Sequence, residues 1–134
     1  MDPIFVITGG PCSGKSTCID ELERRGRTVI REAAREIILE GRLHPARQPV
    51  EFQREVLRRQ LLGELRERRS PAFADRGVGD HFGYIEVFRS ARGVIMPAAF
   101  LDELEAAWTA ARERYAAVFL LARSPHFSGE SYRE

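Results

Sequence analysis

The sequence predicts an α/β fold built on a parallel sheet, and three observations carry that prediction. Short β-branched or aromatic runs alternate with longer segments of helical periodicity along the 134 residues. Most of the short runs are apolar throughout, which is typical of strands that helices cover on both faces. The length suits one domain, because domains commonly have roughly 100 to 150 residues. We therefore expect a single three-layer domain over residues 1–134 with a buried sheet.

The expected elements follow from the local pattern along the chain. Four strands are expected at residues 4–8, 28–32, 71–75 and 117–122, and three helices at 16–25, 33–40 and 50–69. The first two helices end at Gly26 and Gly41, where glycine forms the usual left-handed cap. A further helix opens at Pro97, and its apolar side chains, including Trp108, recur at helical spacing. We interpret these apolar stripes as core.

The composition excludes several classes of partner. The 21 Lys and Arg residues nearly balance the 20 Asp and Glu residues, so the net charge is +1. Nucleic acid and anionic membranes both require a concentrated basic face, so neither is an expected partner. Cys12 and Cys18 imply no disulfide framework, and the apolar runs are too short to span a bilayer. We expect a cytoplasmic protein.

The strongest motif satisfies the pattern G-x-x-x-x-G-K-[ST] between the first strand and the first helix. Its residues are Gly9, Gly10, Pro11, Cys12, Ser13, Gly14, Lys15, Ser16 and Thr17. The glycines let the backbone bend around a polyphosphate, the amide groups and helix N-terminus attract it, and the lysine ammonium reaches the outer phosphates. The serine after the lysine supplies a hydroxyl for Mg²⁺. The motif predicts a P-loop NTPase fold that binds a nucleoside triphosphate and Mg²⁺.

Charged residues end the second and third expected strands. The second strand ends in Arg31 and Glu32, and the third ends in Asp75 followed by Arg76. Ligands of an open parallel sheet gather at the carboxyl ends of its strands. We therefore expect two carboxylates and one or two guanidinium groups beside the phosphate loop.

Each of these residues has a functional and a structural interpretation. Asp75 suits the second anchor for Mg²⁺, or else it caps the following turn. Glu32 suits the group that accepts the proton of an attacking hydroxyl or orients it, or else it is a carboxylate favoured at a helix start. Arg76 suits stabilisation of the transferring phosphoryl group or binding of the acceptor, or else it forms a structural ion pair.

A glycine-rich stretch, residues 77–84, follows the third strand. It holds Asp80, His81 and Tyr84 close to the expected site, and it suits a small polar acceptor in contact with Asp80 and Tyr84. His81 has no Cys or His companions at metal-ligand spacing, so we interpret it as non-ligating.

Three segments resemble the NadR-like ATP-binding family of P-loop proteins, which is often grouped with AAA-type domains. They are residues 5–11, residues 29–38 with the sequence Glu-Ala-Ala-Arg, and residues 73–77 with Asp-Arg-Gly, followed by Asp80 and Tyr84. That family includes a bacterial ribosylnicotinamide kinase domain, and its broader relatives are nucleoside and nucleotide kinases. The resemblance covers nearly all of the chain.

The resemblance implies a role for each matched position. Lys15 and Ser16 would hold the phosphates and Mg²⁺, and Asp75 would support the metal. Glu32 would interact with the acceptor hydroxyl, and Arg76 would stabilise the phosphoryl group during its transfer. These roles make ATP and Mg²⁺ the expected cofactors.

The C-terminal stretch departs from the family. Arg123 and Arg133 fall where such kinases carry a lid over the phosphates, but relatives continue into a lid helix and a final strand, whereas this chain stops at Glu134. We therefore expect the last strand and C-terminal helix to be missing and the fourth strand to be an apolar edge. A missing C-terminal piece or a partner chain, including a second copy, would cover the edge; we favour a truncated reading frame.

Two functions fit these observations. The first is a Mg²⁺-dependent phosphotransferase that moves the γ-phosphate of ATP to a hydroxyl of a small acceptor such as a nucleoside or nicotinamide riboside. The second is a regulatory P-loop ATPase or nucleotide-binding module that acts through a partner. Adenine is favoured over guanine because the guanine-reading segment Asn-Lys-x-Asp requires asparagine, which this chain lacks.

Replacing Lys15 with alanine should abolish nucleotide binding and leave the fold intact. Lys15 is the single lysine among the 21 basic residues, and only a compact point charge fits inside a backbone loop where an arginine fork is too large. Nucleotide titration measures the first effect and circular dichroism the second. Tight ATP binding by a folded Lys15→Ala variant would contradict the assignment.

Overall fold

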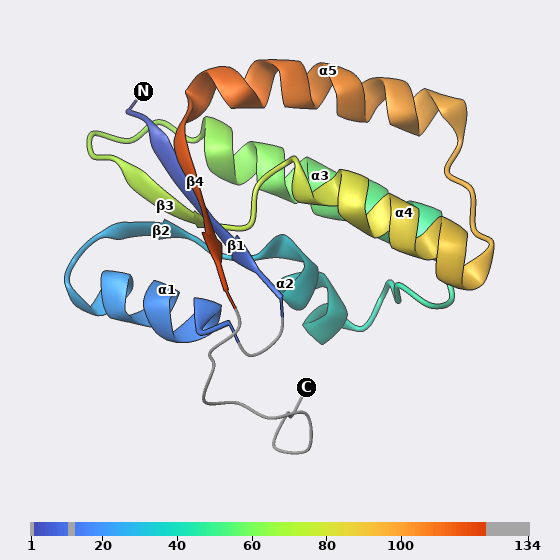
Figure 1. Ribbon diagram of the computed structural model, residues 1–134, viewed down its shortest axis with the longest axis horizontal. Helices are drawn as coiled ribbons and strands as arrows, with labels where there is room; N and C mark the ends of the chain where they lie inside the picture. The colour runs from blue at the N-terminus through green and yellow to red at the C-terminus, as the bar shows by residue number, and fades with distance from the viewer. Residues whose placement is uncertain (1, 11–12, 123–134) are drawn as a thin grey trace.

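The computed structural model describes residues 2–10 and 13–122 and has an α/β architecture (Figure 1). Its strands are β1 (Ile4–Gly9), β2 (Thr28–Ile30), β3 (Ala72–Asp75) and β4 (Tyr115–Leu121). Its helices are α1 (Lys15–Arg24), α2 (Ala33–Glu40), α3 (Pro49–Leu65), α4 (Asp80–Arg92) and α5 (Ala98–Arg114). All pairings in the sheet are parallel, in the order β2-β3-β1-β4, which confirms the expected fold class.

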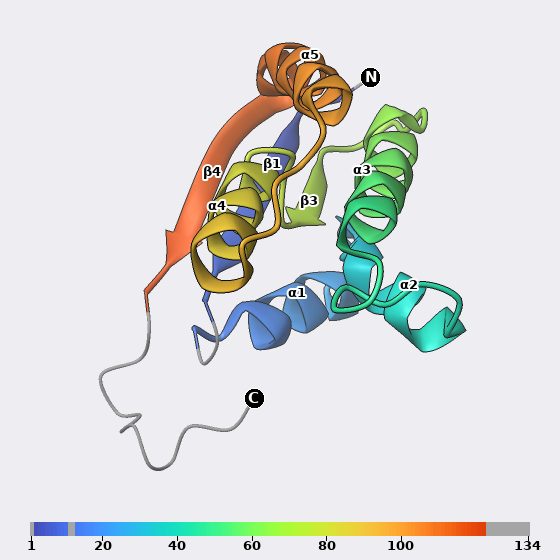
Figure 2. The ribbon, with the colours of Figure 1, turned by 90° about the vertical axis from the view of Figure 1, so that its right-hand side faces the viewer.

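The helices lie on both sides of the sheet. Helix α1 covers one face, and helices α3, α4 and α5 gather on the other (Figures 1 and 2). Alternate side chains of β1 point to opposite faces of the sheet. Val6 packs with Ala74 on the three-helix side. Phe5 stacks on Phe73 on the α1 side, with the ring centroids 5.4 Å apart. Strands β1 and β3 pair in parallel, with Ile7 opposite Asp75, so their carboxyl ends lie together on the side where α1 starts.

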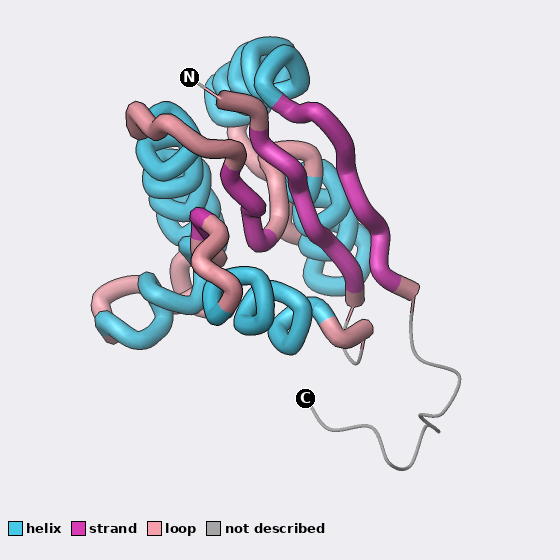
Figure 3. Tube along the Cα trace, turned by 90° about the vertical axis from the view of Figure 1, so that its left-hand side faces the viewer, coloured by secondary structure: helices cyan, strands magenta, loops and turns pink. Residues whose placement is uncertain are grey.

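The three helices on one side have a core of their own. Leu57 of α3 packs with Phe100 and Leu104 of α5, and Trp108 lies against this cluster, as its helical spacing predicts. Helix α2 is attached separately, because its Ile37 packs against Phe52 of α3. Figure 3 shows α2 at the periphery, beside α1 and away from the sheet.

Helix α4 is the main difference from the sequence prediction, which treated residues 77–84 as a glycine-rich stretch and expected no helix there. The helix begins at Asp80 and continues through Gly83 to Arg92. Ile85 and Phe88, three residues apart, both pack against the helical core, and this burial outweighs the low helix propensity of glycine. Helix α3 is shorter than expected and ends at Leu65 instead of residue 69.

Strand β4 is an edge of the sheet, as expected, but it is not buried. Val118, Phe119 and Leu120 expose 54%, 48% and 76% of their surface. The expectation of a sheet covered on both faces is therefore wrong at β4. The helices reach β1 and β3 but leave apolar side chains of the edge strand open to solvent.

A buried carboxylate joins the first residue of β4 to α3. Glu64 is fully buried, and it accepts hydrogen bonds from the Tyr115 hydroxyl at 2.6 Å and from Arg114 at 2.7 Å. The Tyr115 oxygen also accepts a bond from the backbone N–H of Val78 at 2.8 Å. Burial raises the pKa of Glu64. The loop after β3 is thereby held to the three-helix layer.

Within the described residues, every helix is too short or too polar to pass through a lipid bilayer.

Candidate functional site

The phosphate loop connects β1 to α1. Gly14 has φ of +86°, a conformation that glycine adopts readily, and Lys15 follows it as the first residue of α1. At Gly9 a side chain has no room, since a Cβ atom would lie 2.7 Å from the Ser13 hydroxyl and 2.9 Å from the carbonyl oxygen of Leu121. Two of the predicted loop residues, Pro11 and Cys12, lie outside the described residues.

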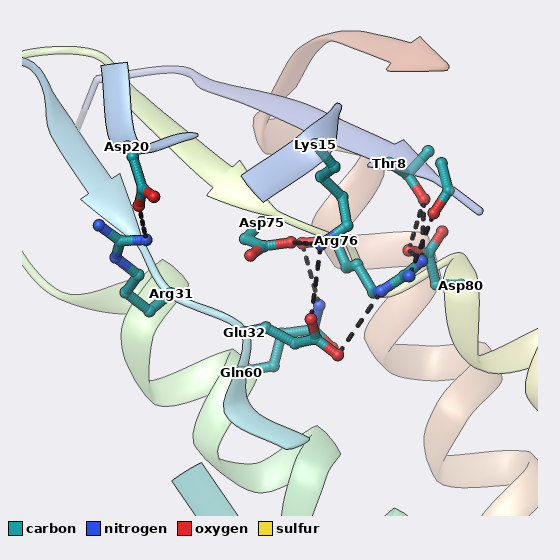
Figure 4. Close-up of polar contacts among 10 residues, drawn as sticks. Thr8, Lys15, Asp20, Arg31, Glu32, Gln60, Asp75, Arg76 and Asp80 are labelled. Carbon is teal, nitrogen blue, oxygen red and sulfur yellow. Dashed lines mark hydrogen bonds and ion pairs between the residues drawn. The ribbon is translucent and has the colours of Figure 1, made fainter. Parts of the chain in front are cut away.

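Lys15 lies between two carboxylates from different strand ends. Its Nζ atom is 2.5 Å from Asp75 Oδ1, at the end of β3, and 3.5 Å from Glu32 Oε2, just beyond β2 (Figure 4). The Lys15 side chain is only 10% exposed. The expected meeting of strand ends thus occurs, and both acidic residues face the phosphate-loop lysine.

Arg76 occupies the other side of Glu32. Its Nε is 3.6 Å from Glu32 Oε1, and its Nη2 donates a hydrogen bond to the Gly9 carbonyl at 3.1 Å. The guanidinium carbon also lies 5.6 Å from the centre of the Tyr84 ring. Burial acts to lower the pKa of Arg76, but Tyr84, Glu32 and Asp80 outweigh it and the pKa is raised, so the group stays charged.

The backbone of Arg76 is strained. Its φ is +72°, in the left-handed region that costs a residue with a Cβ roughly 1–2 kcal/mol. The conformation is held by a hydrogen bond from the Arg76 N–H to the Ile7 carbonyl at 2.9 Å. Strain of this kind persists where the surrounding structure over-determines it, which is common at functional sites.

Asp80 and Thr8 complete the site on the β1 side. The Thr8 hydroxyl donates to Asp80 Oδ2 at 2.9 Å, and Arg76 Nη1 lies 3.4 Å from the same oxygen (Figure 4). The sequence pointed to Asp80 and Tyr84, and the structure brings both to the site. The sequence offered no reason to select Thr8, because its hydrogen bond to Asp80 depends on the start of α4, which was not predicted.

Arg31 does not join the cluster. It pairs with Asp20 at 2.9 Å and with Glu23, both on α1, and Figure 4 shows it apart from Lys15. Of the one or two guanidinium groups expected beside the phosphate loop, Arg76 is the one that pairs with Glu32. Arg123 and Arg133, the expected lid residues, lie outside the described residues.

Two hollows meet at Glu32 and Asp75. One, of about 270 Å³, opens toward α1 and α2 and is lined by Ser16, Asp20, Arg35 and Glu36 among others. The second, of about 30 Å³, lies toward α3 and α4. Ile30, Ala34 and Val56 are among its apolar lining residues, and Gln60, Asp80, His81 and Tyr84 are among its polar ones. A carboxylate at the junction of two hollows can contact groups bound in both.

Ser16 and Asp75, the two residues expected to hold Mg²⁺, could do so from their positions here, in a hollow that Asp20, Glu32 and Glu36 also line. They line the same hollow and offer a hydroxyl and a carboxylate, the hard oxygen donors that this ion prefers. In the described part of the chain, no three His, Cys, Asp or Glu side chains gather into a possible metal site. A site with one or two protein ligands suits Mg²⁺, which takes its other ligands from phosphates and water.

Comparison with known proteins agrees with this geometry. A family model described as an AAA domain matches residues 4–134. No curated protein matches the chain.

The strain at Arg76 leads to a prediction about stability. Arg76→Ala removes the side-chain contacts and keeps the strain, whereas Arg76→Gly removes both. Arg76→Gly should therefore be the more stable variant, by about 1 kcal/mol. Denaturant unfolding of the two variants measures the difference. Equal stability, or a more stable alanine variant, would show that the native backbone is not strained.

His81 leads to a prediction about pH. Burial lowers the pKa of His81 from 6.5 to about 4, so between these values the unfolded chain binds a proton that the folded chain does not. Its contribution to stability is present above pH 6.5 and falls by about 3 kcal/mol as the pH drops toward 4. This part of the pH dependence should vanish in His81→Gln and remain in the control His44→Gln, which alters an exposed histidine. Denaturant titrations across this range test it, and identical pH slopes in all three proteins would refute it.

Proposed function

Because the chain belongs to the AAA-domain family of P-loop nucleotide-binding proteins, we propose that it is an ATP-dependent phosphotransferase acting on a hydroxyl of a small acceptor. One observation carries the proposal: Glu32 lies 3.5 Å from Lys15 Nζ and lines two hollows. The first is the hollow lined by Ser16, or Ser16 hollow, and the second is the hollow toward α3 and α4. A carboxylate in this position can face the phosphates on one side and the acceptor on the other.

The described side chains divide the chemistry among them. When bound, ATP supplies the transferable phosphoryl group, and Mg²⁺ neutralises charge on its phosphates. The acceptor oxygen forms a bond to the γ-phosphorus, the bond from that phosphorus to the β–γ bridging oxygen breaks, and Glu32 accepts the hydroxyl proton. Lys15 and Arg76 stabilise the charge that develops on the transferring group.

The hollow toward α3 and α4 carries the groups that would contact a small ring compound with hydroxyl groups, but its volume of about 30 Å³ has room for water only, so such an acceptor would have to widen it. Ile30, Ala34 and Val56 offer apolar contact to a ring, while Asp80 and Tyr84 offer hydrogen-bonding groups near Glu32. A nucleoside or nicotinamide riboside combines such a ring with a sugar that carries hydroxyl groups. The sequence resemblance to NadR-like proteins points to the same class.

A regulatory module is the second candidate, and the exposed edge of β4 favours it. Val118, Phe119 and Leu120 are open to solvent on a strand whose backbone is unpaired on one side within the described residues. A second copy of the chain could pair with this edge, and Glu32 could then orient water for slow ATP hydrolysis. This candidate predicts nucleotide-dependent association without a phosphorylated product.

The two candidates differ in their product. Incubating the protein with ATP, Mg²⁺ and a panel of nucleosides, followed by mass spectrometry, should reveal one acceptor heavier by a phosphoryl group. Glu32→Gln should lower kcat for that product by about 10²- to 10⁴-fold, the usual contribution of a positioned proton acceptor. Glu113→Gln, an exposed substitution on α5, is the matched control. Phosphate release with no phosphorylated acceptor would favour the regulatory module.

A further inference from the structure

A buried histidine adjoins the site, and the hydrogen bonds of its ring within the described residues go to α3. His81, on the first turn of α4, is 2% exposed, and both of its ring nitrogens are hydrogen-bonded to glutamines of α3. Nδ1 is 2.8 Å from Gln53 Nε2, and Nε2 is 2.8 Å from Gln60 Oε1. Gln53 is itself 3% exposed.

These contacts fix the direction of each hydrogen bond. The Gln53 amide N–H donates to Nδ1, so the proton of the neutral ring is on Nε2, and that N–H donates to the Gln60 carbonyl oxygen. Burial lowers the pKa of His81, in keeping with a neutral ring. With its oxygen turned toward His81, Gln60 donates from its amide N–H₂ to the Arg76 carbonyl oxygen, at 3.4 Å.

The segment from Arg76 to Asp80 is therefore tethered at several points. The Arg76 N–H is bonded to β1, its carbonyl accepts from Gln60, and the Val78 N–H donates to Tyr115. His81 lies immediately after Asp80, whose carboxylate receives the Thr8 hydrogen bond. This segment carries the charged side chains of Arg76 and Asp80. His81 follows it directly at the Asp80 end and is connected to its Arg76 end through Gln60.

We propose that His81 is a positioning residue: through Gln60 it orients the strained Arg76 peptide and so holds the guanidinium between Glu32 and the phosphate loop. This role rests on the proposed phosphotransfer and adds to it a group that acts through Arg76 and not on the reacting atoms, although the ring also lines the hollow toward α3 and α4. A merely structural histidine would need both glutamines equally. A positioning histidine needs Gln60 for function and Gln53 chiefly for its own orientation.

Two glutamine variants separate these roles. Gln53→Met and Gln60→Met each remove one hydrogen-bond partner of the His81 ring. Both residues lie on α3, and methionine is similar in size to glutamine. Both substitutions should lower the midpoint of denaturation. Only Gln60→Met should lower kcat, by about 100-fold, as expected for misplacement of a catalytic group, with the KM values for ATP and for the acceptor both unchanged. Because Gln60 also lines the hollow toward α3 and α4, a raised KM for the acceptor would instead indicate a lost direct contact and would overturn the positioning role.

Two histidine variants provide the rescue test. A glutamine side chain extends as far as the distal ring nitrogen, so His81→Gln can still donate to Gln60, whereas His81→Asn reaches only the Gln53 side. His81→Gln should keep most of the activity, and His81→Asn should behave like Gln60→Met. Equal losses in both pairs of variants would overturn the positioning role.

Hydrogen exchange gives a readout that needs no activity. At matched global stability, the amides of residues 76–80 should exchange faster in Gln60→Met and His81→Asn than in Gln53→Met and His81→Gln. Unchanged protection in all four variants would overturn the proposal even if kcat fell. If the wild-type protein makes no phosphorylated product, the proposed function fails, while the exchange pattern still decides whether His81 orients Arg76.

Discussion

The ion pair of Lys15 with Asp75 and Glu32 is the constraint on which the site depends. An ammonium group that is 10% exposed is costly without compensation, since an unpaired buried charge costs several kcal/mol. The two carboxylates would in turn repel each other without the ammonium between them. This arrangement requires β3 to lie next to β1 with β2 beyond it, which is the observed order. The sheet order and the charge cluster therefore support each other.

Much of this cluster could be predicted because it follows from the general geometry of parallel sheets. Glu32 and Asp75 lie where strands end, and Lys15 begins the helix that follows the loop after β1; parallel strands bring these positions to one edge of the sheet. The prediction left open whether one or two guanidinium groups join the cluster, and Arg31, next to Glu32 in sequence, lines the Ser16 hollow but pairs with Asp20 and Glu23 on α1. Sequence adjacency at a strand end does not fix which way a long side chain turns.

The start of α4 could not be predicted, and most of the missed residues trace to it. Glycines at 77, 79 and 83 indicate a loop by local propensity, whereas packing of Ile85 and Phe88 against the helical core stabilises a helix. Once α4 begins at Asp80, Thr8 acquires a partner, and His81 faces the glutamines of α3. These contacts join residues between 21 and 72 positions apart, so no local pattern reveals them.

The loop between β3 and α4 transmits the packing of the core to the charged site. Tyr115 holds its middle through Val78, and the same hydroxyl donates to the buried Glu64 of α3. Gln60, one turn before Glu64 on that helix, holds the Arg76 carbonyl. A shift of α3 would therefore move both tethers together, and the guanidinium of Arg76 would move relative to Glu32. These two tethers hold the Arg76 backbone in its strained left-handed conformation. The position of the Arg76 guanidinium therefore depends on how firmly α3 is packed.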